Sequence, residues 1–453
     1  MANSEKFRLK LLIDEKRNKV VLAEANQDFA DVLISLLTLP MGRIAKLLGN
    51  HKTVLGCYKN LNRSVSDMGF GHFETEACKI MLLCLKSTKG IHCKNLKLNM
   101  GDTTPTRFLT CPKLFENGSC SRRTYSNFYG SRCSCGALMS AEILVPEEEQ
   151  VGEVIGNNED GVFVNSRSSF IITDDLKVTS NSTGGITKVL NDLGYVGFSD
   201  LRETLLDVGF GEVRNLLGCL FTSEDPLTCA FLRETYTTRK HEWLSPPAPN
   251  LLRYLFERLT GRVCSVKVFV RKLDREILYA ECNEDFVDSL LSFLALPLEL
   301  ACSLPYWDVL GICAEVLVEE LLPKVVNFLI IIFAVTTICS IMYTNQECDG
   351  EIVTLSPNDP KVEPGASSGC GSGFMKKSTK FVVSNDLVIT PMSSSSIIGL
   401  LKKMQVDISD LQDYQLSISK AELISILKAS LISSSALTIG LSNLLAKIPK
   451  EEN

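Results

Sequence analysis

The stretch LKLLIDEKRNKVVLAEANQDFADVLISLLTLP, residues 9–40, returns 257 residues later as VKVFVRKLDREILYAECNEDFVDSLLSFLALP, residues 266–297. The two copies align without a gap, and twelve positions are identical. A second pair, SFIITDDLKVTSNSTGGI (169–186) and KFVVSNDLVITPMSSSSI (380–397), follows in the same order. We call the first pair the A units and the second the B units. An A-B-A-B order predicts a tandem of two similar halves.

The A units predict a β-hairpin followed by a helix. Apolar and polar residues alternate on both sides of a turn-like stretch, which is typical of paired strands. Asn26 or Asp28 then caps a helix with apolar residues at helical spacing, and Pro40 ends that helix or begins the next turn. The recurring carboxylates Asp28 and Asp285 are therefore interpreted as caps or first-turn residues rather than as acid–base groups.

The B units predict two short strands around a polar turn, residues 174–175 in one copy and 385–386 in the other. A helical region is expected next, and in the first half it carries Leu193, Leu201, Leu205 and Leu206. Both halves end in an amphipathic helix. The predicted fold class is α+β, a tandem duplication whose halves each pack small antiparallel sheets on helices, with a cysteine-rich insertion in the first half.

The repeat also sets the predicted domain boundaries. The first half covers residues 1–236, a linker rich in proline and polar residues covers 237–262, and the second half covers 263–453. The units within the halves are A1 at 7–145 with the cysteine-rich insertion at 92–136, B1 at 162–236, A2 at 263–345 and B2 at 374–453.

Composition bounds the class of protein. The chain has 453 residues, 45% of them hydrophobic, 22% charged and a net charge of −6, which suits a globular protein. The acidic balance weighs against wholesale binding to nucleic acid or to a membrane surface. No apolar run follows a basic region at the start of the sequence, so we expect a cytoplasmic protein whose 17 cysteines are mostly reduced.

Four cysteines in the first half form the pattern C-P-x7-C-x12-C-x-C-G. They are Cys111, Cys120, Cys133 and Cys135. Thiolates are ligands that zinc prefers, and the flanking proline and glycine favour tight turns that aim backbone N–H groups at sulfur. The spacing departs from the usual pair separated by two residues. Free buried thiols and a redox-labile pair therefore stay open as alternatives, and His92 or Cys93 could replace one ligand.

The cysteine cluster lies in a locally basic segment, residues 92–135, in which aromatic side chains alternate with lysines and arginines. Cations interleaved with aromatics suit phosphate contact and base stacking. A nucleic-acid-binding module at 92–135 is therefore one alternative. The plainer interpretation is a solvated loop with a small aromatic core.

Residues 325–343 form a long uncharged run that meets the length criterion for a transmembrane helix. A span here would place units A2 and B2 on opposite sides of a membrane, whereas the matching units of the first half share one compartment. The alternatives are a buried helix or a pair of strands, because the run is rich in β-branched residues.

The opening of the first A unit, the CP…CSCG cluster and the segment FVVSNDLVITPMS resemble the plant family catalogued as domain of unknown function 674. The resemblance covers most of the chain, although residues 325–343 depart from it. The family has no established activity, substrate or catalytic residue. The resemblance therefore implies organisation and not mechanism.

One stretch matches a catalytic motif, the G-x-S-x-G at residues 365–369, which lies in a glycine- and serine-rich linker with every histidine before it. A nucleophile elbow needs a strand before the serine and a histidine after it, so we reject this match. The leading hypothesis is a non-enzymatic cytosolic scaffold or interaction protein with a structural zinc site. A membrane-anchored protein and a nucleic-acid-binding module are the alternatives. The sequence names neither a protein partner nor an oligomeric state.

Overall fold

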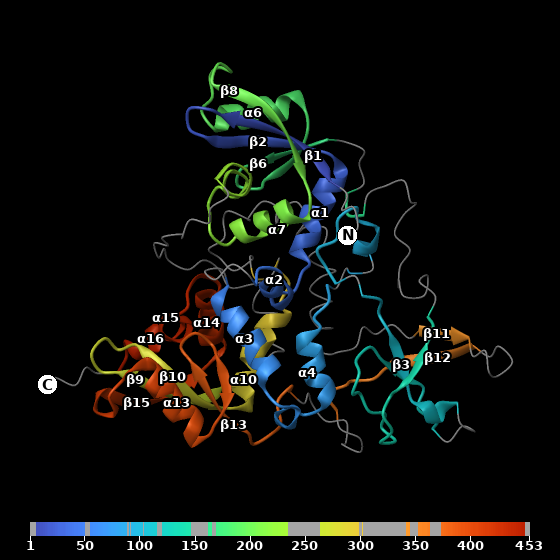
Figure 1. Cartoon of the computed structure of the whole chain (residues 1–453), viewed down its shortest axis with the longest axis vertical. Helices are drawn as coiled ribbons and strands as arrows, with labels where there is room; N and C mark the ends of the chain where they lie inside the picture. Colours follow the sequence, from blue (N-terminus) through green and yellow to red (C-terminus); the bar gives the residue numbers. More distant parts are fainter. Residues whose placement is uncertain are drawn as a thin grey trace.

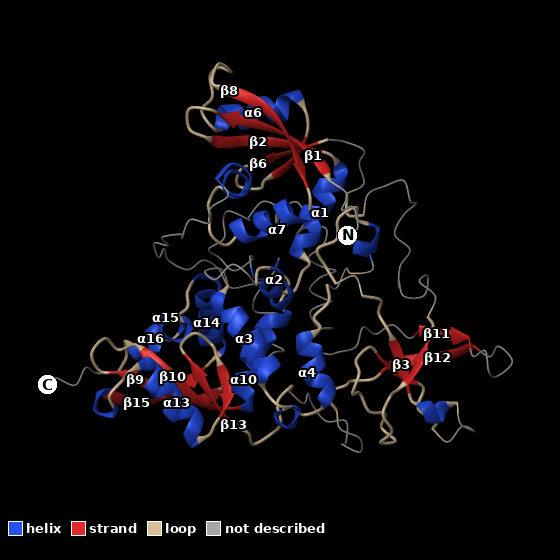
Figure 2. Cartoon of the chain, in the orientation of Figure 1, coloured by secondary structure: helices blue, strands red, loops and turns tan. Residues whose placement is uncertain are grey.

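The chain was analysed as a computed structural model that describes residues 6–49, 55–87, 90, 92–102, 104–115, 120–145, 162–164, 169–233, 263–298, 301, 341–344, 352–362 and 373–448. Its described parts form three five-stranded sheets, and helices pack against two of them (Figures 1 and 2). The predicted linker at 237–262 and the motif at 365–369 lie outside these residues.

The first two sheets are equivalent. The sheet of the first half has the order β7-β6-β2-β1-β8, and that of the second half has the order β14-β13-β10-β9-β15. All pairings within them are antiparallel. The strands are β1 (Phe7–Asp14), β2 (Lys19–Ala25), β6 (Phe170–Thr173), β7 (Val178–Ser180), β8 (Leu201–Val208), β9 (Cys264–Arg271), β10 (Ile277–Asn283), β13 (Lys380–Ser384), β14 (Ile389–Pro391) and β15 (Leu411–Ile418). This correspondence confirms the predicted α+β tandem duplication.

Helices of the two halves correspond in the same way. The three matched pairs are α1 (Gln27–Leu37) with α10 (Glu284–Ser292), α6 (Thr183–Asp192) with α13 (Ser394–Met404), and α7 (Phe210–Cys219) with α14 (Lys420–Ile432). The other helices are α2 (Met41–Leu47), α3 (Gly56–Asp67), η1 (Phe70–His72), α4 (Glu76–Leu83), η2 (His92–Asn95), η3 (Pro112–Leu114), α8 (Pro226–Thr228), η4 (Cys229–Arg233), η5 (Phe293–Ala295), η6 (Ile408–Asp410), α15 (Ala436–Gly440) and α16 (Ser442–Leu445).

Helix α1 begins as predicted. The side chain of Asn26 caps it by accepting a hydrogen bond of 3.2 Å from the Phe29 backbone N–H, and Asp28 lies in the first turn. Phe29 and its repeat equivalent Phe286 are both fully buried in the main hydrophobic core. The acidic residues at these helix starts are therefore part of helix initiation, as the sequence indicated.

The predicted helical region after the first B strands is wrong in part. The helix ends at Asp192, and Leu201, Leu205 and Leu206 lie in strand β8, which pairs along its whole length with β1. Gly194 has φ +80°, a left-handed conformation that stops a helix. β8 is then an edge strand, in which Leu205 stays 65% exposed. The same strand recurs as β15 at the edge of the second sheet.

The two halves meet where their Leu-Pro turns cross. Pro40 and Pro297 form an antiparallel bridge. The backbone N–H of Met41 donates to the Leu296 carbonyl at 2.8 Å, and that of Leu298 donates to the Leu39 carbonyl at 2.9 Å. These two bonds are equivalent under the repeat, so the halves are related by a local two-fold relation at this point. One continuous hydrophobic core runs across it.

The chain leaves this crossing to pack on the other half. α3 belongs to the first half in sequence but packs against α14, β14 and η5 of the second (Figure 1). Asn60 donates to the Asp386 carboxylate at 2.9 Å, and the Ile389 N–H donates to the Ser64 hydroxyl at 2.8 Å. The two halves are thus interwoven rather than merely joined end to end.

A buried aspartate performs the same task in each half. Asp31 accepts backbone N–H groups of residues 162–164 at 2.8 to 3.0 Å through both of its carboxylate oxygens. Its equivalent Asp288 accepts those of Phe374 and Met375 at 2.9 and 3.0 Å, both through Oδ1. Each aspartate fixes the segment that leads into the B unit. Burial raises the pKa of Asp31, and it raises that of Asp288 to about 7.

A second buried contact is repeated with different residues. The Thr228 N–H and hydroxyl donate to Asp174, and Lys19 lies 4.0 Å from the same carboxylate. In the second half the Thr438 N–H donates to Asn385 at 3.0 Å, and the Asn385 amide donates to Glu276 at 3.0 Å. Lys19 and Glu276 are equivalent under the repeat, and so are Asp174 and Asn385. The first half therefore pairs a lysine with a carboxylate here, and the second half pairs a glutamate with an amide.

The apolar run at 325–343 lies mostly outside the described residues. Its last three residues belong to strand β11 (Ile341–Thr344), which pairs with β12 (Ile352–Pro357). Within the described part of the chain, no helix combines the length and the apolarity that crossing a bilayer requires.

Replacing Gly42 tests the close approach at the crossing. A Cβ on this residue of α2 would lie 2.7 Å from Leu85 Cδ1 and 3.1 Å from the Leu294 carbonyl oxygen of the other half. We expect Gly42→Ala to lower the free energy of unfolding by about 1–3 kcal/mol, measured by urea denaturation. The matched control is Gly211→Ala in α7, where a Cβ meets nothing within 4 Å and alanine favours the helix. Equal effects in the two variants would contradict this account of the crossing.

The two buried aspartates should respond differently to the same substitution. The unfolded chain loses its Asp288 proton near pH 3.9, whereas the folded protein keeps it to about pH 7. This group therefore lowers stability as pH rises from about 4 to about 7. Asp288→Asn keeps Oδ1 as the acceptor and removes that loss, so at pH 8 the variant should be at least as stable as the parent.

Asp31→Asn replaces one accepting oxygen with an amide that faces the Val162 N–H. We expect it to cost about 1–3 kcal/mol at pH 8 in the same denaturation measurement. The reverse order of stability for the Asp31 and Asp288 variants would show that the two carboxylates are not used as described.

Candidate metal centre

The cysteine-rich segment folds around a small sheet. β3 (Phe108–Thr110) lies between β4 (Thr124–Ser126) and β5 (Ala141–Ile143), and both pairings are antiparallel. β12 from the second half then joins β4 in parallel, with Ser356 opposite Thr124. The third sheet of the molecule is therefore built from both halves (Figure 1).

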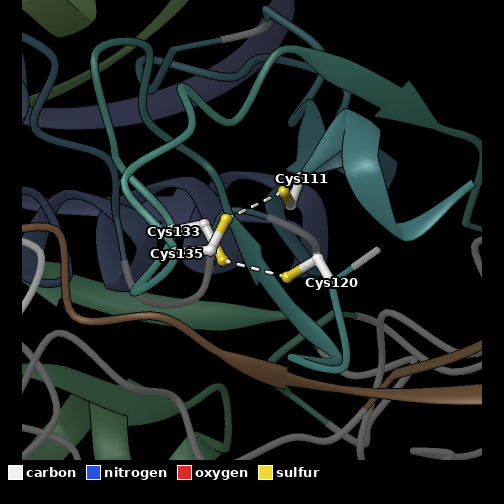
Figure 3. Close-up of side chains that lie close together, drawn as sticks. All are labelled: Cys111, Cys120, Cys133 and Cys135. Carbon is white, nitrogen blue, oxygen red and sulfur yellow. Dashed lines mark hydrogen bonds between the residues drawn. The ribbon is translucent and has the colours of Figure 1, made fainter. Parts of the chain in front are cut away.

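The four predicted cysteines converge at one end of this sheet. Their sulfur atoms all lie within 4.8 Å of one another (Figure 3). The Cys111 and Cys135 sulfurs are 3.6 Å apart, and those of Cys120 and Cys133 are 3.7 Å apart. A disulfide would need about 2.05 Å, so these are neighbouring free thiols. In a tetrahedron of thiolates each about 2.3 Å from zinc, the sulfurs lie ~3.8 Å apart, close to the two distances here.

Local turns bring the sulfurs to this position. Pro112 starts the short helix η3 immediately after Cys111, and the Leu114 N–H closes it on the Cys111 carbonyl at 3.0 Å. At the other corner the Gly136 N–H donates to the Cys133 carbonyl at 2.8 Å. Gly136 has φ +87°, which a residue with a side chain rarely adopts. The proline and glycine that the sequence placed beside the cysteines therefore shape both corners.

Backbone N–H groups are aimed at the sulfurs. The N–H of Ala137 and hydrogen bonds from neighbouring thiols hold the pKa of exposed Cys135 down at about 7. Burial raises the pKa of Cys133, and it raises that of Cys111 to about 12, against a hydrogen bond from the Lys113 N–H. A divalent cation would reverse these raised values, because a coordinated thiol is deprotonated. The cluster of four cysteines, three of them buried, can accordingly hold a metal ion.

Other residues singled out in the sequence lie elsewhere. His92 and Cys93, the possible substitute ligands, belong to η2 and are not members of the sulfur cluster. Of the basic residues, Lys97 pairs with Asp28. Arg107 donates to the Tyr129 hydroxyl at 2.5 Å and lies 3.5 Å from Glu142. Nothing in these contacts tests nucleic-acid binding, which stays a prediction.

The aromatic residues of this segment support the plainer interpretation in part. Phe108 and Tyr125 are buried with their ring centroids 5.5 Å apart, in a small core completed by Leu355 of β12. Sequence reasoning missed that second-half strand. The signal that could have found it was a short β-branched run ending in leucine, residues 352–355, just before a proline- and glycine-rich segment.

The chain belongs to the family described as "Protein of unknown function (DUF674)", which it matches over residues 3–319 and 318–421. The two matched segments together run from residue 3 to residue 421 and include the cysteine cluster. No curated protein and no solved structure matches the chain. The family supplies an organisation shared with its members and assigns no activity.

Elemental analysis of the purified full chain tests the site directly. We expect about one metal ion per chain, because four thiolates complete a closed tetrahedral site. Cys133→Ser and Cys135→Ser should each lower that stoichiometry below half, since serine is a poor ligand for a soft site. The control is Cys84→Ser, which removes an exposed thiol outside the cluster and should leave the stoichiometry unchanged. An unchanged metal content in both cluster variants would contradict the assignment of these cysteines as metal ligands.

Proposed function

We propose that the protein is a non-enzymatic cytosolic scaffold or interaction protein whose four-cysteine cluster, Cys111, Cys120, Cys133 and Cys135, holds a structural zinc ion. The observation that carries the proposal is the spacing of the four sulfurs, whose pairs at 3.6 and 3.7 Å suit tetrahedral thiolate coordination. Four protein ligands close the coordination sphere. They leave no open position for a catalytic water, which is how structural zinc sites differ from catalytic ones.

The carboxylates that recur in both halves support a structural interpretation. Asp31 and Asp288 use their oxygens on backbone N–H groups. Glu24 accepts from Asn181 at 2.9 Å, and Asp28 pairs with Lys97. These groups hold strands and helices together, so their repetition follows from the need to build the same fold twice.

The position of the cluster suggests what the zinc does. β3 and β4 carry the cysteine turns, and β4 is the strand to which β12 of the second half is paired. The Ser356 N–H donates to the Arg123 carbonyl at 2.9 Å, and the Asn358 N–H donates to the Tyr125 carbonyl at 2.7 Å. A metal that fixes the β3–β4 hairpin would thereby fix a strand from the far half. Zinc in this role ties two distant parts of the chain into one surface, as a scaffold requires.

Hydrogen exchange of the zinc-loaded full chain before and after chelation tests this role. Zinc removal should speed exchange at the Ser356 and Asn358 amides by about tenfold or more, because the hairpin that accepts their hydrogen bonds loosens. The internal control is the pair of Phe374 and Met375 amides, which Asp288 holds and which should change little.

Two results would reject the proposal. One is unchanged exchange at Ser356 and Asn358 after complete removal of zinc, which would deny the metal a structural role. The other is measured hydrolase, transferase or redox turnover by the full chain that is lost in a variant of a defined pocket, which would make the protein an enzyme.

A further inference from the structure

A cavity of about 600 Å³ lies apart from the sulfur cluster, where the two halves and the cysteine-rich segment meet. Its floor is apolar and comes from both halves. Leu39 and Pro40 contribute from the first half, and Ala295 and Phe374 contribute from the second. All four are buried. The volume lies in the range of about 300–1,000 Å³ that is usual for small-molecule sites.

The rim of this cavity has a different character from its floor. Lys86 follows α4, Lys94 lies in η2, and Arg107 precedes β3, so three separate elements each bring one cation to the opening. All three side chains are exposed. Among the described residues that line the cavity, Asp102 is the one carboxylate.

The negative charge of Asp102 already has partners within the protein. Against the effect of burial, hydrogen bonds from Thr104 and the charges of Lys86 and Arg43 hold the pKa of this carboxyl below its usual range. The Arg43 guanidinium also donates to the Gly101 carbonyl at 3.1 Å, which keeps it beside this loop. Arg107 also has a carboxylate beside it, since Glu142 lies 3.5 Å away. With these carboxylates counted, the described residues at the rim still hold four cations (Arg43, Lys86, Lys94 and Arg107) against two anions (Asp102 and Glu142), in a chain whose net charge is −6. A local excess of this kind attracts anions.

We propose that this cavity binds a small organic anion, with a ring-sized apolar body on the floor and its carboxylate, sulfonate or phosphate group at the cationic rim. The lining has an apolar surface and a cationic surface, so it favours a ligand that has both an apolar body and an anionic group. An apolar molecule without charge would leave the rim unused, and an inorganic anion would leave the floor unused. This inference is independent of the metal site, because none of the four cluster cysteines lines the cavity.

Two matched fluorescent probes test the proposal on the full-length, zinc-loaded protein. 8-Anilinonaphthalene-1-sulfonate carries the apolar body and the anionic group, and N-phenyl-1-naphthylamine carries the body alone. We expect the sulfonate to bind with a stoichiometry of one and more tightly than its neutral analogue. High salt should weaken the binding of the sulfonate only.

Variants locate the site. Lys86→Met and Lys94→Met should each weaken sulfonate binding about tenfold, the usual scale for losing one charge-assisted contact, and should change binding of the neutral probe by less than threefold. Lys86→Arg keeps the charge and should retain affinity. Lys188→Met, an exposed lysine on α6 outside the cavity, makes the same change in net charge and should have no effect.

Three outcomes would overturn the proposal. They are no saturable sulfonate binding, equal affinity for the two probes, and sulfonate binding that survives both Lys86→Met and Lys94→Met. Circular dichroism of each variant separates loss of binding from loss of fold, and Lys86→Arg remains informative if a methionine variant does not fold.

Discussion

The reciprocal hydrogen bonds between the two Leu-Pro turns constrain the rest of the molecule. Proline has no N–H, so the residues on either side of Pro40 and Pro297 supply the donors and acceptors of the bridge. Because the turn residues are buried, their backbone groups must find partners inside the protein. Each turn provides the other's partners, and this fixes where α2 and α3 go next. The interwoven packing of α3 on the second half and the floor of the cavity both follow from that single crossing.

Much of this fold could be predicted from the sequence, because the repeat carries its own evidence. The A-unit hairpins and helices, the B-unit hairpins and the terminal helices are all local patterns, and the structure contains each of them. Strand β8 was missed because Leu205 and Leu206 are adjacent and stand among charged residues, which interrupts the alternation of apolar and polar residues. Strand β15 does alternate from Tyr414 to Ile418, and that short pattern was overlooked. The crossing of the halves was missed for a different reason. The crossing depends on which surface of one half contacts which surface of the other. The spacing of residues within one half carries no information about that contact.

The candidate metal centre was predictable in its ligands and not in its surroundings. Four cysteines with an adjacent proline and glycine indicated tight turns around sulfur, and the structure brings these four sulfurs together with Gly136 in a left-handed conformation. The substitute ligands His92 and Cys93 were excluded only by three-dimensional placement. The contribution of β12 and the cationic rim of the cavity arise from residues far apart in the chain. Such sites become visible only after the halves are packed.

The contrast between Lys19 with Asp174 and Glu276 with Asn385 has a consequence for how a duplicated chain folds. Each half contains a hairpin and a B unit that could dock on the wrong copy, since strand order and register correspond in the two sheets. If the second hairpin docked on the first B unit, the half-exposed Glu276 would face the buried Asp174 carboxylate, and two negative charges would lie side by side. The converse error would place Lys19 against the amide of Asn385 without its compensating charge. The charge difference between the two copies therefore destabilises swapped docking relative to correct docking.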